Sequence, residues 1–92
     1  MKTTDLVENI GEAAMYEQLA EECVELAHAC LKKARKLRGE NPTPMEIEKI
    51  DENVIEEYTD VRLVSSLLAI DVDLPLYREK FDRWWERLID NS

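Results

Sequence analysis

Apolar residues recur along the chain at steps of three and four, the spacing of a helix with one buried face. The pattern is clearest from Glu12 to about Arg38, a stretch that contains no Gly or Pro. Gly39 follows a basic last turn, which is typical of a helix end. The apolar positions of this stretch are Ala13, Met15, Tyr16, Leu19, Ala20, Cys23, Leu26, Ala27, Cys30, Leu31, Ala34 and Leu37. No segment keeps a period of two, so the sequence predicts an all-α fold.

A second long helix is predicted after the GENPTP segment at residues 39–44, which we interpret as a loop. Thr43 is expected as its N-cap and Pro44 as its first helical residue, with Glu46 completing a capping box. Apolar residues at helical spacing then continue to about Ile70, where this helix is expected to end.

Two shorter helices flank this long pair. Thr4 or Asp5 is expected to cap the first, which reaches about Ile10 before Gly11 interrupts the pattern, and Asp73 is expected to cap the last. The apolar face of the last helix comprises Leu76, Tyr77, Phe81, Trp84, Trp85, Leu88 and Ile89. We therefore expect one domain over residues 1–92, four-helix-bundle-like, with two long central helices and shorter N- and C-terminal helices. Because 92 residues bury only a small core, it is expected to assemble as an oligomer.

Acidic residues outnumber basic ones, 21 to 12, which leaves a net charge of -9. Such a chain is a poor binder of nucleic-acid polymers, and a cation or a basic partner suits it better. The basic run at residues 32–38, KKARKLR, is interpreted as a solvated helix end, with an RNA-binding patch as the alternative. No apolar run approaches the length of a membrane span, and the N-terminus lacks the apolar region of a signal peptide. We expect a cytoplasmic protein with no membrane partner.

Cys23 and Cys30 are seven residues apart. On one helix this spacing separates them by about 10 Å, which is too far for a disulfide bond. We interpret both as small buried residues in a reducing compartment.

Carboxylates three residues apart occur five times, as often as chance predicts for 21 acids, so their context must separate them. Glu22 and Glu25, and likewise Glu57 and Asp60, adjoin the apolar stripes of the two longest helices. If these helices face each other, the four carboxylates need protonation or a counter-charge. Mg²⁺ prefers such oxygen ligands and commonly joins carboxylates to phosphates. The alternative is that all four are solvated or paired with Lys and Arg.

The two acidic motifs, EExxE at residues 21–25 and ExxD at residues 57–60, resemble those of the MazG-like nucleoside triphosphate pyrophosphohydrolases. These belong to the all-α NTP pyrophosphatase superfamily. QLAEECVELAHACLKKARKLRGENPTP and IEEYTDVRLVSSLL resemble the two central helices of its phage-type and bacterial members. YREKFDRWWERL resembles their basic closing helix. The resemblance covers roughly residues 11–90.

This resemblance implies hydrolysis of (d)NTP to (d)NMP and pyrophosphate through a metal-bound water. It makes Glu22, Glu25, Glu57 and Asp60 the ligands of Mg²⁺, with Mn²⁺ as the alternative ion. Glu21 and Glu22 are the candidate catalytic residues, Glu21 orienting the water or holding a further ion.

Lys80 and Arg83 are the candidate substrate-binding residues, since three-residue spacing lets both reach phosphate oxygens. Pairing with neighbouring acids is their alternative role. Trp84 and Trp85 are expected in a core or interface rather than stacked on a base. The resemblance further implies a homodimer or homotetramer. The alternative function is a non-catalytic acidic helical module that binds a protein partner.

Overall fold

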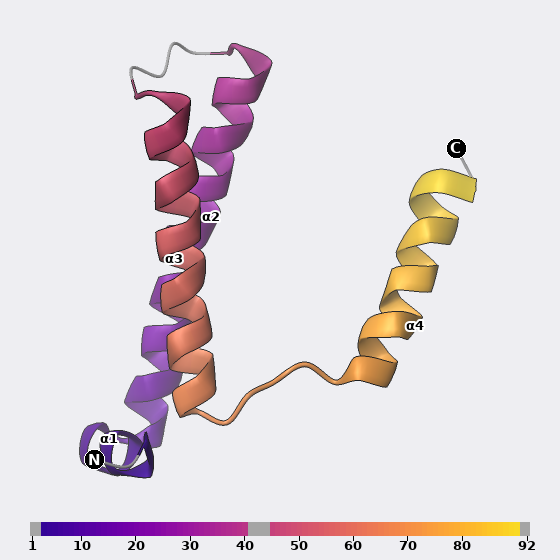
Figure 1. Cartoon of the computed structure of the whole chain (residues 1–92). Coiled ribbons are helices and arrows are strands. Elements are labelled where there is room, and N and C mark those ends of the chain that lie inside the picture. Colours follow the sequence, from indigo (N-terminus) through magenta and orange to yellow (C-terminus); the bar gives the residue numbers. More distant parts are fainter. Residues whose placement is uncertain (1–2, 41–44, 91–92) are drawn as a thin grey trace.

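The chain is all-helical in the residues that the computed structural model describes, 3–40 and 45–90, and no strand occurs among them. The helices are α1 (Thr3–Ile10), α2 (Glu12–Arg38), α3 (Ile47–Leu67) and α4 (Leu74–Trp85), and α4 continues into a π-helical turn, η1 (Glu86–Asp90) (Figure 1). Two long and two short helices confirm the predicted fold class.

The centre of the molecule is an antiparallel hairpin of α2 and α3, with α1 packed against one end of it (Figure 1). Its seam holds the four buried apolar side chains of the described residues, Met15 and Ala29 from α2 and Ile50 and Val64 from α3. A core of this size covers one stripe of each long helix, and the remaining residues of both helices are half-buried or exposed.

Glycines mark both ends of α2, as the sequence predicts. Gly11 has φ 100° between α1 and α2, and Gly39 has φ 70° and donates its backbone N–H to the carbonyl oxygen of Lys36. A side chain rarely adopts these conformations, so glycine is the suited residue at both positions.

The prediction that α3 begins at Pro44 is wrong, because the helix starts at Ile47 with Glu46 as its N-cap. The backbone of Glu46 is extended, with φ -67° and ψ 148°, and no side-chain hydrogen bond caps the helix. Met45 is half-buried there and its Sδ accepts a hydrogen bond from Lys32 Nζ at 3.8 Å. Met45 thus contacts α2 and lies before the first turn of α3. The predicted cap Thr43 lies outside the described residues.

The other end of α3 comes earlier than the predicted Ile70, since the helix ends at Leu67. Ala69 lies in the left-handed region with φ 58°. The backbone N–H of Ala69 donates to Ser66 and that of Ile70 donates to Ser65. These two bonds form a Schellman motif, which terminates α3 with an alanine where glycine is usual.

Asp73 caps α4 as predicted, since its Oδ1 accepts a hydrogen bond from the Leu76 backbone N–H at 3.0 Å. The helix nevertheless stands apart: among the described elements α4 contacts η1 and neither α2 nor α3 (Figure 1). The radius of gyration is 17.1 Å, against about 12 Å for a compact domain of this length. Four helices are therefore present, but a single chain does not pack them into the expected bundle.

Both cysteines are free and exposed, so the prediction that they are buried is wrong. They lie on a stripe of α2 that neither α3 nor α4 covers. The apolar residues around them in the sequence predicted burial, but no element of the described chain covers this stripe of α2.

No helix in the described part of the chain combines the length and apolar character that a membrane span requires.

Candidate metal centre

The two acidic pairs occupy matching positions on the two long helices. Counting about 100° per residue from the seam residues Met15 and Ile50, Glu22 and Glu57 each lie about 20° from the seam, close to the helix contact. Two antiparallel helices present equal rotations to the same side of their hairpin. The acids of both motifs consequently lie together along one side of the seam.

Three carboxylates gather at this point: one oxygen from each of Glu22, Glu57 and Asp60 lies within 4.8 Å of the other two. All three side chains are half-buried. Glu22 is held by Gln18 of the preceding turn, whose Nε2 donates to Glu22 Oε1 at 2.7 Å. One acid of α2 and two of α3 thus converge across the helix contact.

The electrostatics of the cluster are unfavourable for three separate charges. Partial burial raises the pKa of Glu57 above its ordinary value, and the negative charges of Asp60, Glu25, Glu56 and Glu22 raise it further. In the described part of the chain no Lys or Arg forms an ion pair with Glu57 or Asp60. The alternative that lysines and arginines neutralise this group therefore does not hold for these two residues.

The donor chemistry fits a hard divalent cation. Three carboxylates from two rigid helices offer only oxygen ligands, and they leave room for water or phosphate oxygens in the remaining positions. A cation would also relieve the repulsion that raises the pKa of Glu57.

Glu25, the fourth predicted ligand, is exposed and is not one of the three gathered carboxylates. It lies one turn further along α2 and remains close enough for its charge to act on Glu57. Glu21, the predicted water-orienting residue, is also exposed. It precedes Glu22 by one residue and is therefore rotated about 100° away from the cluster.

Lys80 and Arg83 lie on α4 and so are not brought to the carboxylates in this chain. Arg83 pairs with Glu79 at 3.2 Å, one turn earlier on the same helix. Lys80 lines an open hollow with the aromatic residues Tyr77, Phe81 and Trp84. Their assignment to substrate phosphates stays a prediction.

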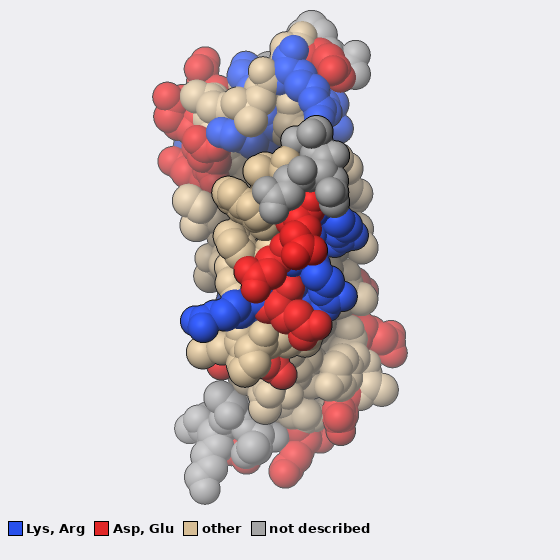
Figure 2. All heavy atoms as spheres, turned by 90° about the vertical axis from the view of Figure 1, so that its right-hand side faces the viewer, with Lys and Arg blue, Asp and Glu red and all other residues tan. Residues whose placement is uncertain are grey.

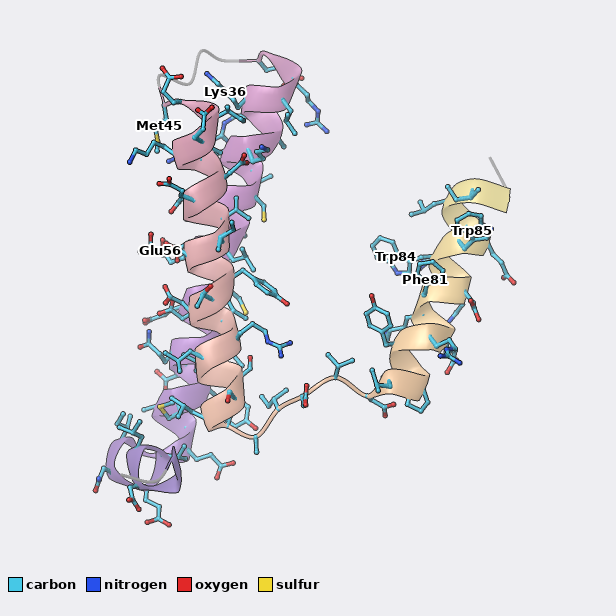
Figure 3. The ribbon with its side chains drawn as sticks, in the orientation of Figure 1. Lys36, Met45, Glu56, Phe81, Trp84 and Trp85 are labelled. Atoms are coloured by element: carbon cyan, nitrogen blue, oxygen red, sulfur yellow. The ribbon has the colours of Figure 1, made fainter. Side chains whose placement is uncertain are left out.

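Sequence reasoning missed two residues around the cluster. Gln18 fixes Glu22 through a contact of i,i+4 spacing, which the sequence could have revealed as a polar pair on one helix face. Glu56 adds to the negative charge at Glu57. The side chain of Glu56 projects from the side of α3 that is turned away from α4 (Figure 3).

The basic run of α2 also takes part in the hairpin, at the end far from α1. Lys33 forms an ion pair with Asp51 of α3. Arg35, Lys36 and Arg38 occupy the last turn of α2, where positive charge complements the helix dipole. These contacts favour a structural role for the run.

In comparisons with protein-family models, with curated proteins and with solved structures, nothing matches this chain. The functional argument accordingly depends on the site itself.

Proposed function

We propose that this protein is a Mg²⁺-dependent nucleoside triphosphate pyrophosphohydrolase, which converts (d)NTP to (d)NMP and pyrophosphate in the cytoplasm. The observation that carries the proposal is the convergence of Glu22, Glu57 and Asp60 on one point between two long helices. The motifs that predict such a site, EExxE and ExxD, are the ones that supply these residues.

Each residue of the site has a distinct role in this proposal. Glu22, Glu57 and Asp60 hold the ion, and Glu25 approaches from the next turn of α2 to complete the set. Glu21 is exposed and precedes Glu22 on α2, and we assign to it the orientation of the attacking water and the acceptance of its proton. When bound, the ion neutralises the triphosphate and favours attack at the α-phosphorus. Mn²⁺ also satisfies oxygen ligands of this kind.

The triphosphate requires cationic contacts beyond the ion, and Lys80 and Arg83 remain our candidates for them. Since α4 stands apart from the hairpin, these contacts depend on how the protein assembles. We therefore propose that the active form is a homo-oligomer, either a dimer or a tetramer.

The test is release of pyrophosphate from a panel of NTPs and dNTPs with and without Mg²⁺. We expect Glu57→Gln to lower kcat/KM by about 100-fold or more, because an ion at the reacting phosphate contributes several kcal/mol. Glu48→Gln is the matched control: it makes the same change on α3, at an exposed position outside the cluster.

Absence of turnover across the panel, together with absence of a Mg²⁺-dependent thermal shift, would contradict this function and favour the non-catalytic protein-interaction module. Equal rates for the wild type and Glu57→Gln would retain the activity and reject the assigned site.

A further inference from the structure

The carboxylate cluster is bordered by an uncharged hydrogen-bond donor, Gln18. Its amide Nε2 donates to Glu22 Oε1 at 2.7 Å, across one turn of α2. Other acids in the described part of the chain have cationic partners: Asp51, Glu52 and Glu79 pair with Lys33, Lys49 and Arg83. Figure 2 shows acidic and basic side chains sharing one stripe on the α4 side of the molecule. Glu22 is instead held in place without any loss of its negative charge.

The charge of this donor matters at a metal site. A Lys or Arg beside a ligand carboxylate repels the incoming ion, and the ion pair has to separate before the carboxylate can bind the ion. A neutral amide orients the carboxylate and adds neither cost. Carboxylates that bind metals are commonly hydrogen-bonded in this way, and loss of such a partner typically weakens metal binding by about 10–100-fold. Gln18 thus has the chemistry of a residue that prepares Glu22 for a cation.

Gln18 lies on the side of α2 that carries the cluster. Counting from the seam residue Met15, Gln18 is rotated by about 60° in the sense of Glu22 and Glu25, whereas Cys23 is rotated by about 80° in the other sense. Gln18 is exposed and is not one of the buried residues of the seam. Substitution of Gln18 therefore removes the hydrogen bond to Glu22 and leaves the core of the hairpin intact.

The corresponding acid of α3 lacks such a partner. Asn53 precedes Glu57 by one turn, just as Gln18 precedes Glu22, but its side chain is one methylene shorter. Among the residues that the structure describes, no hydrogen bond joins Asn53 to Glu57. The cluster therefore combines a carboxylate that α2 fixes with carboxylates of α3 that can adjust to an ion.

The hydrogen bond also limits how Glu22 can meet an ion. Because Oε1 is engaged with the amide, an ion that chelates both oxygens has to weaken this bond, whereas an ion that binds through Oε2 alone keeps it. Ca²⁺ takes about 6–8 oxygen ligands, and carboxylates often bind it through both oxygens. Mg²⁺ is smaller, requires a near-ideal octahedron and keeps several waters. A carboxylate that offers one oxygen therefore suits Mg²⁺ better than Ca²⁺.

We propose that Gln18 is a positioning residue of the metal centre, which holds Glu22 so that one oxygen meets the ion and thereby favours Mg²⁺ over Ca²⁺. The inference rests on the proposed function for the place of the ion, and it concerns the choice of ion rather than the reaction. Ion binding is measured without nucleotide, so the role of Gln18 can be tested separately from turnover.

The test is isothermal titration of the full chain with Mg²⁺ and with Ca²⁺ in the absence of nucleotide. Gln18→Ala should raise the dissociation constant for Mg²⁺ by about 10-fold or more, as expected when a ligand loses the partner that orients it. The constant for Ca²⁺ should change by less than about 3-fold, because the freed oxygen lets Glu22 chelate the larger ion. The preference for Mg²⁺ over Ca²⁺ should therefore fall.

Two further variants separate the hydrogen bond from other effects of the substitution. Asn53→Ala removes an amide at the same spacing on α3, where no hydrogen bond to Glu57 is lost, and should keep the preference of the wild type. Gln18→Glu keeps the shape of the side chain but replaces the donor by a like-charged acceptor, so it should lose the preference as Gln18→Ala does.

Thermal melts without metal distinguish positioning from a structural role. Because Gln18 is exposed, Gln18→Ala should melt at the temperature of the wild type. A purely structural role would instead lower this temperature and weaken the binding of both ions alike, which overturns the proposal.

The outcomes for Gln18 and for the hydrolytic function are distinguishable. An equal preference for Mg²⁺ over Ca²⁺ in the wild type and in Gln18→Ala overturns the role of Gln18, even where pyrophosphate release persists. Loss of the preference in Asn53→Ala also overturns it, as does a wild type that binds neither ion. The expected change of preference in a protein without turnover supports the role of Gln18 and contradicts the hydrolytic function.

Discussion

Glu25 and Asp60 lie on one broad face of the α2–α3 hairpin, and Cys23 and Tyr58 lie on the other. Both faces adjoin the same buried seam, yet they differ in what makes them unfavourable: charge repulsion on one and exposed apolar area on the other. The carboxylate face carries negative charges that repel one another and raise the pKa of Glu57. The opposite face exposes apolar area, including Tyr58. Ionic conditions should therefore act on the carboxylate face and much less on the other.

Breaking the seam should affect both faces together and produce the largest loss of stability. Ile50 is 0% exposed, so Ile50→Ala should lower the free energy of unfolding by about 2–5 kcal/mol. Urea unfolding followed by circular dichroism measures this. Leu63→Ala, at a 58% exposed position of the same helix, should change it by less than about 0.5 kcal/mol. Similar losses in the two variants would contradict the assignment of the core.

Mg²⁺ should stabilise the folded protein by binding at the carboxylate face alone. At ten times its dissociation constant it should add about 1.4 kcal/mol, which raises Tm by roughly 5–10 °C. Glu57→Gln should remove this shift, and Glu48→Gln should keep it. A persistent shift in Glu57→Gln would show that the ion binds elsewhere.

The same shift should depend on pH in a defined direction. Because the pKa of Glu57 is raised in the folded chain, protons compete with the ion, and the Mg²⁺ shift should shrink as the pH falls towards that raised pKa. Without metal, the contribution of Glu57 to the free energy of unfolding changes with pH in the opposite direction. The folded state binds the proton more tightly, so this contribution is present below the ordinary value of 4.5 and lost as pH rises through the raised pKa. Thermal melts of the wild type and Glu57→Gln over a range of pH measure both effects.

Removing the cap of α4 should destabilise α4 and leave the carboxylate face unchanged. Asp73→Ala removes the side-chain acceptor for the Leu76 backbone N–H and should destabilise α4 by about 1 kcal/mol. Faster amide exchange at Leu76 is the direct measurement. The Mg²⁺-dependent shift should remain unchanged, and a reduced shift would show that α4 and the carboxylate face are coupled.

The smallest effect is expected at Ala69, after the end of α3. Ala69→Gly should stabilise the chain by up to about 1 kcal/mol, because glycine adopts a positive φ without the steric cost that alanine incurs. Ala69→Val, which adds branching at the same position, should destabilise it. Urea midpoints distinguish the two. A reversed order would contradict the left-handed conformation of Ala69.

The helix boundaries show where local signals suffice. Gly11 and Gly39 define both ends of α2 through their own backbone conformations, so the sequence predicts this helix to the residue. At the start of α3, Met45 lies outside the helix and contacts Lys32, thirteen residues earlier in the chain. A capping pattern in the sequence does not contain that tertiary contact.

The carboxylate cluster could be predicted only in part, for a geometric reason. Spacing of three residues keeps Glu22 and Glu25 on one side of α2 but leaves them about 60° apart and one turn apart along the axis. The cluster therefore takes Glu22 without Glu25, whereas Glu57 and Asp60 both reach it. The axial register of α2 against α3 decides this, and spacing within one helix does not define that register.

The exposure of Cys23 and Cys30 could not be predicted from the apolar pattern, because the pattern does not identify whether another element covers that side of the helix. The same holds for the aromatic residues of α4. Trp84 and Trp85 are exposed in this chain, and the prediction that they lie in an interface stays a prediction.

The detached α4 links the stability of this protein to its abundance. If a second copy covers α4 in the proposed homo-oligomer, dilution should expose its aromatic side chains, and the unfolding midpoint should rise with protein concentration. Protein concentration would then act on this chain as a ligand concentration does on other proteins.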